Sequence, residues 1–480
     1  MRHLSWIMFL GALSITTAAQ ADTKLTYSGV YTAWSQSQHA FRFDADAYDD
    51  NYIVQMLRLN LALAPNERMK VVTRFDMGQG WWGVDNADRT VNRTGATGGS
   101  SLFDFKDTNF LLHVDQAYAQ FTLAPHPLTF RVGRQSFRLG NKLVIDNNLD
   151  GIQLDIGGVG DGLTIGWAKM SEGGDNISDI DASKTGGADN RDADLLLVNF
   201  RSKMAGGTYN LFSAYYTDRS SDDGNAYIPD HLNYFKTRFS AQPTTLTVFG
   251  LAGDTKLGAI KLAGEVEYLT GTDDVDNATH GAQAWDINNG DLSGFNLYLK
   301  ADMPMGDRLS VGGVFGMGSG DDDLTSGAGN VNKIRTSGFF YLTEIWEDSI
   351  MPDEEGITPQ GLGAPNVRGY RELENTTALQ VNGTFKPSKK LSLFASATYL
   401  QATQDIPAWN NDGTPNYALT ANDLGQEVDF RVSYLIEQGL SAHLRGGIFM
   451  PGDAAGYLIN GNALSDDSAW ELKGVITLKF

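Results

Sequence analysis

The stretch "EVDFRVSYLIEQGLSAHLRGGIFM", residues 427–450, contains two runs of alternating apolar and polar residues joined by a short turn. Successive side chains of a β-strand point to opposite faces, so each run has one apolar and one polar face. The apolar faces carry Val428, Phe430, Val432, Tyr434 and Ile436 in the first run, and Leu444, Ile448 and Met450 in the second. The polar faces carry Glu427, Asp429, Arg431 and Ser433, followed by His443 and Arg445. Such strands fit a sheet between an apolar medium and water.

The same alternation recurs along the chain, and it predicts an all-β protein. It is clear in "LRLNLAL" (57–63), "LTIGWA" (163–168), "IKLAGEVEYL" (260–269), "FNLYLK" (295–300) and "LSLFASATYL" (391–400). We find no amphipathic helix of ordinary length. Beyond residue 21 no run approaches the roughly 18 apolar residues that a membrane helix needs.

The connections between these runs alternate between short and long. Short turns are expected at 65–68, 125–127, 158–161, 205–207, 255–258, 305–307, 387–390 and 437–439. Long polar loops are expected at 79–108, 171–191, 218–243, 272–290, 321–373 and 405–423. Eight hairpins plus a first and a last strand give eighteen strands, with both termini on the short-turn side.

This pattern predicts a single transmembrane antiparallel β-barrel of about 18 strands, with short periplasmic turns and long extracellular loops. Residues 1–21 resemble a secretory signal peptide, which leaves 22–480 for the barrel. The final strand, "AWELKGVITLKF", ends at Phe480 and resembles the segment that the barrel-assembly machinery recognises. We therefore expect the outer membrane of a Gram-negative bacterium, with lipid and lipopolysaccharide as neighbours.

Composition excludes several other classes of protein. The chain has 480 residues, a net charge of −21 and no cysteine, so it carries no lipoprotein anchor, c-type haem site or disulfide scaffold. Its acidity argues against nucleic acid as a partner. We find no motif of a serine, cysteine or zinc hydrolase, so an enzyme is not expected, although a barrel lipase or protease is the alternative.

No cofactor is expected. The acidic segments "TDDVDN" (272–277) and "GDDD" (320–323) offer ligands for Ca²⁺ or for bridging lipopolysaccharide, and a solvated loop is the simpler interpretation. "DNNLDG" (146–151) is similar to a calcium loop but has Gly157 where a bidentate Glu is needed.

An eighteen-stranded barrel is wide enough to contain an aqueous channel. The parity of each strand places a further set of charged residues inside it, comprising Arg58, Arg74, Asp76, Arg201, Glu265, Glu267 and Lys300. Arginine binds carboxylates through two parallel hydrogen bonds, so inward arginines predict an anion-selective pore. We expect Asp76 to position Arg74, and Asp429 to position Arg431, since each pair lies two residues apart on one face.

"TFRVGRQSFRLG", residues 129–140, breaks the alternation. Strict parity would put some of its arginines against lipid, at a cost of about 2–4 kcal/mol each near the midplane. A β-bulge at Gly133 would resolve the conflict. It would turn Arg131, Arg134 and Arg138 inward and leave Phe130, Val132, Phe137 and Leu139 in the membrane.

Several segments resemble the alginate-export outer-membrane porins. These are "GQEVDFRVSYLIEQGLSAHLRGGIFMPGDAAG" (425–456), "FRVGRQ" (130–135), "GYRELENTTALQ" (369–380) and "GMGSGDDD" (316–323). The resemblance implies a monomeric eighteen-stranded barrel whose arginine-rich constriction passes an anionic uronic-acid polymer. The positions that match are Arg131, Arg134, Arg371, Glu372, Asp429 and Arg445. The chain departs from the family at Met450, where a Lys is expected, and at His443, where an Arg is expected.

The sequence thus predicts a passive channel for anionic solutes, either uronic-acid oligosaccharides or small organic anions. We expect the loop 321–373, which contains "FFYLTEIWEDSIM", to fold into the mouth and narrow it. The alternatives are a general or cation-preferring porin dominated by Glu265, Glu267 and Glu427, a barrel that sheathes a periplasmic partner, and a soluble β-protein.

Overall fold

The computed structural model describes residues 23–44, 49–82, 112–171, 193–218, 244–273, 290–320, 342–347, 373, 375–410, 415–464 and 466–480. The predicted signal peptide and the candidate residues Arg371 and Glu372 lie outside these ranges. Within them, no helix is long and apolar enough to cross a membrane.

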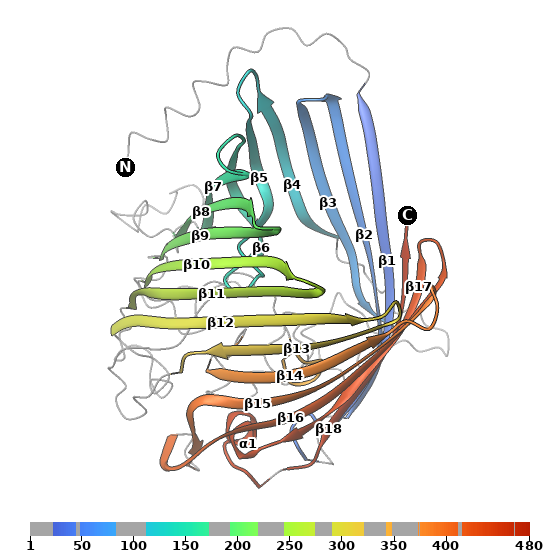
Figure 1. Cartoon of the computed structure of the whole chain (residues 1–480), viewed down its shortest axis with the longest axis vertical. Helices are drawn as coiled ribbons and strands as arrows, with labels where there is room; N and C mark the ends of the chain where they lie inside the picture. The colour runs from blue at the N-terminus through green and yellow to red at the C-terminus, as the bar shows by residue number, and fades with distance from the viewer. Residues whose placement is uncertain are drawn as a thin grey trace, which may run out of the picture.

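Eighteen strands and one short helix form the described part of the chain (Figure 1). The first nine strands are β1 (Lys24–His39), β2 (Asp50–Asn66), β3 (Met69–Trp81), β4 (Leu112–Leu123), β5 (Leu128–Arg138), β6 (Asp146–Ile156), β7 (Gly162–Ser171), β8 (Ala193–Met204) and β9 (Gly207–Asp218). The others are β10 (Thr244–Leu257), β11 (Ile260–Asp273), β12 (Gly290–Met305), β13 (Leu309–Gly318), β14 (Thr376–Phe385), β15 (Leu391–Trp409), β16 (Pro415–Glu437), β17 (Leu440–Pro451) and β18 (Ala469–Lys479). The helix α1 (Asp453–Asn460) lies between β17 and β18.

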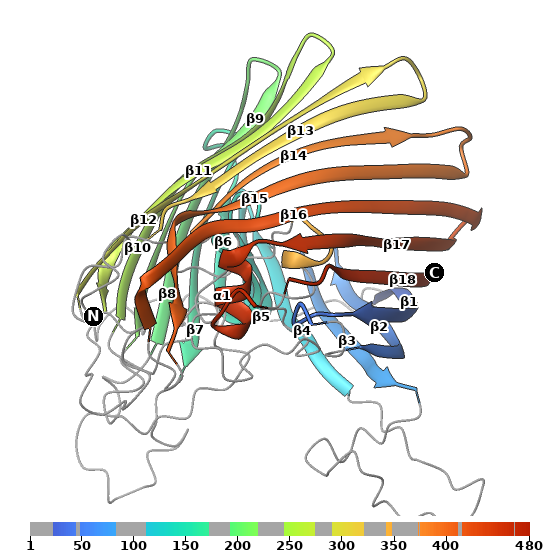
Figure 2. The ribbon, with the colours of Figure 1, turned by 90° about the horizontal axis from the view of Figure 1, so that it is seen from below.

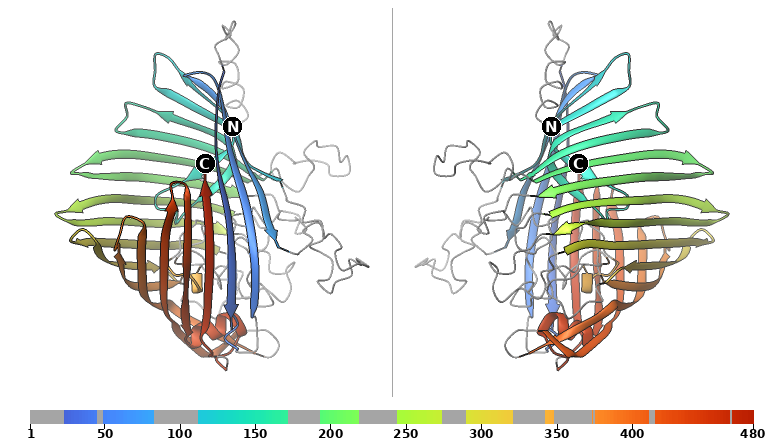
Figure 3. Two further views of the ribbon diagram at one scale, coloured as in Figure 1. Left: turned by 90° about the vertical axis from the view of Figure 1, so that its right-hand side faces the viewer. Right: turned by 90° about the vertical axis from the view of Figure 1, so that its left-hand side faces the viewer.

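The sheet closes on itself. Each strand pairs antiparallel with its neighbours in sequence, and β1 pairs with β18, where Trp34 lies opposite Val475 (Figure 3). At the end of this seam the backbone groups of Gly29 and Phe480 bond to each other at 2.8 and 3.0 Å. Closure removes the unpaired edges that an open sheet would leave in hydrocarbon. The predicted eighteen-stranded antiparallel barrel is confirmed.

All eight predicted short turns connect strands on one end of the barrel, which we call the short-turn side, and the longer connections lie on the other, the long-loop side. The predicted loop at 405–423 is wrong, because β15 and β16 continue through it and leave only residues 410–414 between them. Tyr417 and Leu419 are exposed there. Ala418 and Thr420 between them are exposed as well, so neither face of this stretch is buried and the alternation of buried and exposed positions is missing there.

The two faces of the wall follow the predicted parity. On β16, Val428 is 50% exposed and Phe430 38%, whereas Glu427 and Asp429 between them are 0% and 2% exposed. Exposed apolar side chains that alternate with buried charged ones identify the outer and inner faces of a membrane barrel. On β17, Leu444, Ile448 and Met450 are likewise exposed.

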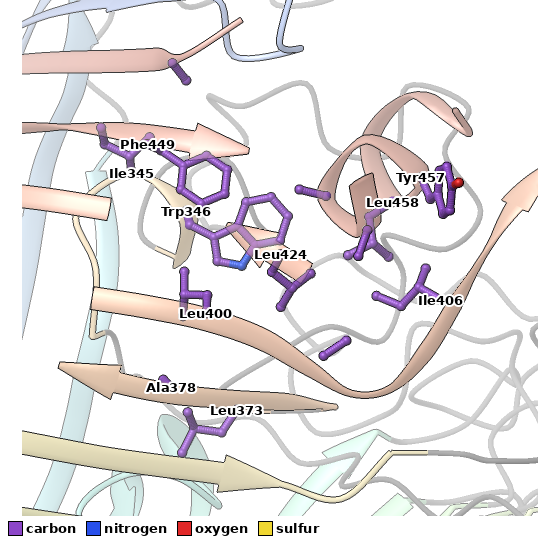
Figure 4. Packing of buried hydrophobic residues seen from close by; sticks show 14 of the residues in the cluster. Ile345, Trp346, Leu373, Ala378, Leu400, Ile406, Leu424, Phe449, Tyr457 and Leu458 are labelled. Carbon is purple, nitrogen blue, oxygen red and sulfur yellow. The ribbon is translucent and has the colours of Figure 1, made fainter. Parts of the chain in front are cut away.

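The inner face is partly covered by the chain's own connections. The segment 342–347, from the β13–β14 connection, places Trp346 against Phe43 and Phe449, and the ring centroids of Trp346 and Phe449 are 4.9 Å apart (Figure 4). Helix α1 packs against β15, β16 and β17 and joins the same apolar cluster (Figure 2). Trp346 is 1% exposed, so this cluster is a packed core inside the barrel.

A second interior cluster corrects the prediction for residues 129–140. The ladder runs through Gly133 without a register shift, opposite Tyr118 on β4 and Gly151 on β6. The expected bulge is therefore wrong, and parity puts Arg131 on the opposite face of β5 from Arg134 and Arg138.

Phe137 and Leu139 are also placed differently from the prediction. Both are 0% exposed and pack with Leu195 and Leu197, which alternate with exposed residues of β8 and so lie on its inner face. Pairing of β5 with β4 ends at Arg134, whereas pairing with β6 continues to Arg138. The far end of this hairpin therefore packs inside the barrel, and its apolar residues meet protein instead of lipid.

Gly133 should be intolerant of any side chain. Its φ is +120°, and an added Cβ would lie 2.4 Å from the carbonyl oxygen of Ala117. We expect Gly133→Ala to cost about 1–3 kcal/mol of stability, seen as a lower urea midpoint for loss of the heat-modifiable folded band. Gly313→Ala is the matched control, because its nearest atom would lie at 3.5 Å, and an equal loss in both variants would contradict the argument.

Candidate functional site

The first group of inward charges lies on β2, β3 and β4, and we call it the β2–β4 cluster (Arg58, Arg74, Asp76, Asp115). Arg58 donates two parallel hydrogen bonds to Asp76, at 2.7 and 2.6 Å. Arg74 pairs with Asp115, whose other oxygen accepts a 2.6 Å bond from Asn148 of β6. Two guanidinium groups thus alternate with two carboxylates along the wall.

A β-bulge supplies one member of this cluster. Arg74 lies opposite Gln116 and Phe75 opposite Val114, so Asp115 is the extra residue on β4. A bulge re-aims the side chain it inserts, and here it brings a carboxylate to Arg74. The alternation of apolar and polar residues breaks in "HVDQ" (113–116), and this break is the feature of the sequence that indicates the bulge at Asp115.

The second group lies on β16, β17 and the segment 342–347, and we call it the β16–β17 cluster (Arg431, Arg445, Glu344). Arg431 and Arg445 are directly opposite each other in the ladder. The carboxylate of Glu344 contacts both guanidinium groups, with Arg445 at 3.1 Å. On the short-turn side of the pair, His443 bonds to Ser433 at 2.9 Å.

Two buried carboxylates of the wall hold the inward connections in place. Glu427 accepts backbone N–H groups of Ile345 at 2.6 Å and Trp346 at 2.9 Å. Glu265 accepts the backbone N–H of Asn141, from the β5–β6 connection. A buried carboxylate is costly without donors, so each of these glutamates fixes the connection that supplies its hydrogen bonds.

The remaining predicted residues are more dispersed. Arg131 pairs with Asp155 at 2.9 Å and contacts Gln153 at 3.2 Å. Arg134 pairs with Asp150 at 3.3 Å on the face that carries the exposed Val132. The others are Arg138, exposed at the end of β5, Arg201, exposed near the short-turn end of β8, and Lys300, which pairs with Asp302 at 3.4 Å.

Both predicted positioning pairs are wrong. Asp76 pairs with Arg58 across the ladder, while Arg74 pairs with Asp115. Arg431 pairs with Glu344, and Asp429 instead accepts a 3.3 Å bond from Ser396. Residues two apart on one strand are farther apart than directly opposed residues of adjacent strands, so cross-strand partners prevail. Glu344 lies in a long connection without periodicity, where no sequence signal marks it.

In both clusters the guanidinium groups are more exposed than the carboxylates that pair with them. The side chain of Arg58 is 35% exposed and that of Asp76 16%. The side chains of Arg431 and Arg445 are 43% and 32% exposed, against 10% for Glu344. Glu265, Glu267 and Glu427 are at most 2% exposed. The most exposed charged groups of these clusters are therefore guanidinium groups.

One group in the described part of the chain has the spacing of a metal site, namely Asp76, His113 and Asp115. Both carboxylates are already paired with Arg58 and Arg74, and a cation there would meet two guanidinium groups. The segment "DNNLDG" forms the start of β6 and is not a calcium loop. "TDDVDN" and "GDDD" lie almost entirely outside the described residues.

Comparison with known proteins agrees with this architecture. Residues 364–458 match the model of the family described as Alginate export. The Pseudomonas aeruginosa protein OpdO has a similar structure, with a TM-score of 0.52 and 12% identity, covering 95% of this chain and 97% of that one. A BenF-like porin from Pseudomonas fluorescens Pf-5 gives a TM-score of 0.50 and 11% identity over 96% and 100%.

A third similar structure, Pseudomonas aeruginosa OpdK with vanillate, gives a TM-score of 0.50 and 10% identity over 95% and 98% of the two chains. No curated protein matches the sequence. The fold is that of outer-membrane porins. The family match covers residues 364–458 only, and the structural similarity extends over nearly the whole chain.

The two buried glutamates should act on separate connections. In Glu427→Gln the amide keeps the shape of the side chain but offers only one acceptor oxygen, so either the Ile345 or the Trp346 N–H loses its partner. The unpaired N–H should cost about 1–3 kcal/mol of stability. We expect roughly tenfold faster amide exchange in the peptide containing 342–347 and no change in the peptide containing 139–145. Glu265→Ala removes the acceptor of the Asn141 N–H and should give the reverse, and a general rise in exchange in either variant would contradict this division.

Proposed function

We propose that the protein is an outer-membrane channel of a Gram-negative bacterium that passes anionic solutes. The observation that carries the proposal is the unequal exposure within the ion pairs of both clusters, where the guanidinium groups are more exposed than their carboxylate partners. A lumen lined in this way attracts anions and raises their local concentration. It also offers donors that replace part of the solute's hydration.

The alternative of a cation-preferring porin rests on three acidic residues that the structure places away from water. Glu265, Glu267 and Glu427 are buried, and each accepts a hydrogen bond from the protein. Carboxylates that are buried and hydrogen-bonded to the protein are not available to contact a cation in the lumen, whereas the partly exposed arginines are available to an anion. We therefore favour anion over cation preference.

The alternative of a sheath around a partner protein is opposed by the interior packing. The segment 342–347, helix α1 and the β5–β6 hairpin occupy space inside the barrel. The space that these segments occupy is not available to a partner protein. The partial match to the Alginate export family suggests uronic-acid chains, and the OpdK structure with vanillate suggests small aromatic carboxylates.

Reversal potentials in a KCl gradient across planar bilayers test the sign of selectivity. We expect the wild-type channel to prefer chloride, and Arg431→Gln with Arg445→Gln to lower the anion-to-cation permeability ratio by about threefold or more. The pair of Lys substitutions at these positions keeps the charge and should keep most of the preference.

Arg134→Gln provides the matched control for this measurement. It removes one positive charge from the face that carries Val132, whereas the double variant removes two from the inner face, so the single substitution should leave the reversal potential unchanged. Cation preference in the wild-type channel would overturn the proposed function.

The β13–β14 connection should narrow the pore. Replacing residues 321–372 with a short Gly-Ser linker removes the segment 342–347 from the interior, and the single-channel conductance should rise. An unchanged conductance in a variant that still gives a heat-modifiable folded band would refute the narrowing.

A further inference from the structure

We propose that Glu344 is a built-in competitor for a carboxylate-binding site formed by Arg431 and Arg445. A solute carboxylate that binds both guanidinium groups would displace the side chain of Glu344. Glu344 would then set how strongly the channel holds carboxylate solutes. This inference rests on the proposed function, because it assigns the chemistry of one site along the anion path.

The first step of the argument is the crowding of positive charge. Arg431 is opposite Arg445, and Arg445 is opposite Lys473 of β18, so three cations form one row across three adjacent strands. Like charges directly opposite each other destabilise a sheet. Lys473 is balanced within the wall by Glu471, at 2.7 Å. The carboxylate that balances the two arginines is that of Glu344, which belongs to the interior segment 342–347 and not to a strand of the wall.

The second step concerns how Glu344 reaches the arginines. Glu344 belongs to the segment 342–347, which the ladder does not include. Its position depends on the hydrogen bonds from Ile345 and Trp346 to Glu427 and on the packing of Trp346 against Phe449. The arginines and the carboxylate are thus held by different parts of the molecule, so the contact can break while the barrel stays intact.

The third step concerns access. Along β16, Glu427 lies on the long-loop side of Arg431, and Ser433 lies on its short-turn side. Because Glu427 anchors the segment, Glu344 approaches the arginines from the long-loop side. The arginine side chains remain 43% and 32% exposed. A solute from the short-turn side would therefore meet two partly exposed guanidinium groups whose shared counter-ion is a carboxylate.

The carboxylate of Glu344 stands where a solute carboxylate would bind, and it makes the same charge-assisted hydrogen bonds. Neutralising it in Glu344→Gln keeps the size of the side chain and removes the competing charge. Because such bonds are worth on the order of a tenfold change in affinity, we expect glucuronate to block the ion current about tenfold more tightly in this variant.

Three controls separate competition from a change in pore shape. Glucose has nearly the size of glucuronate without its charge, and its effect on the current should not change. Asp302→Asn removes one carboxylate from another ion pair, with Lys300, and should not tighten the block by glucuronate. The triple variant with Glu344→Gln, Arg431→Gln and Arg445→Gln removes all three charges of the cluster together. It should not show the tighter block by glucuronate that is expected in Glu344→Gln alone.

The outcomes for this inference and for the proposed function are distinct. An anion-selective wild type whose block by glucuronate is unchanged in Glu344→Gln would overturn the inference and leave the proposed function standing. A wild type without anion preference that gains an Arg-dependent block in Glu344→Gln would support the inference and overturn the proposed function. Equal tightening by glucose and glucuronate would also overturn the inference.

Discussion

The backbone pairing that joins β1 to β18 is the constraint on which the rest of the structure depends. In hydrocarbon every N–H and C=O group must find a partner within the protein, and only a closed ladder gives one to each strand. The mutual bonds between Gly29 and Phe480 complete that ladder. Once the barrel is closed, the parity of every strand is fixed, and apolar residues such as Val428 must face out while Glu427 and Arg431 face in.

Closure creates a second requirement, because an eighteen-stranded wall encloses more space than its own side chains fill. The protein uses its long connections for this purpose. Trp346 packs against Phe43 and Phe449, and Phe137 packs against the inner face of β8. The wall residues that receive these connections include Glu265 and Glu427, which explains how ionisable groups come to lie fully buried on strands that otherwise border water.

The strand number, the turns and the faces of β16 and β17 could be predicted from the sequence, because each depends on local alternation or on turn residues. The partners of the arginines could not. Asp115 reaches Arg74 through a bulge, and Glu344 reaches Arg431 through a connection 87 residues away in sequence. The bulge predicted at Gly133 is wrong for a related reason. The alternation of apolar and polar residues is interrupted near the point where β5 separates from β4 and turns inward. Alternation alone cannot distinguish an apolar strand face that contacts lipid from one that contacts another part of the barrel.

Single wall residues anchor the interior segments. The filling of the barrel's interior is therefore set separately from its circumference, although both would otherwise depend on the number of strands. The circumference of the barrel is set by eighteen strands, but part of its interior is filled by two connections, one bound to β11 through Glu265 and the other to β16 through Glu427. Related chains could therefore diversify in what they admit by exchanging the anchored connections one at a time, without altering the ladder that the membrane requires.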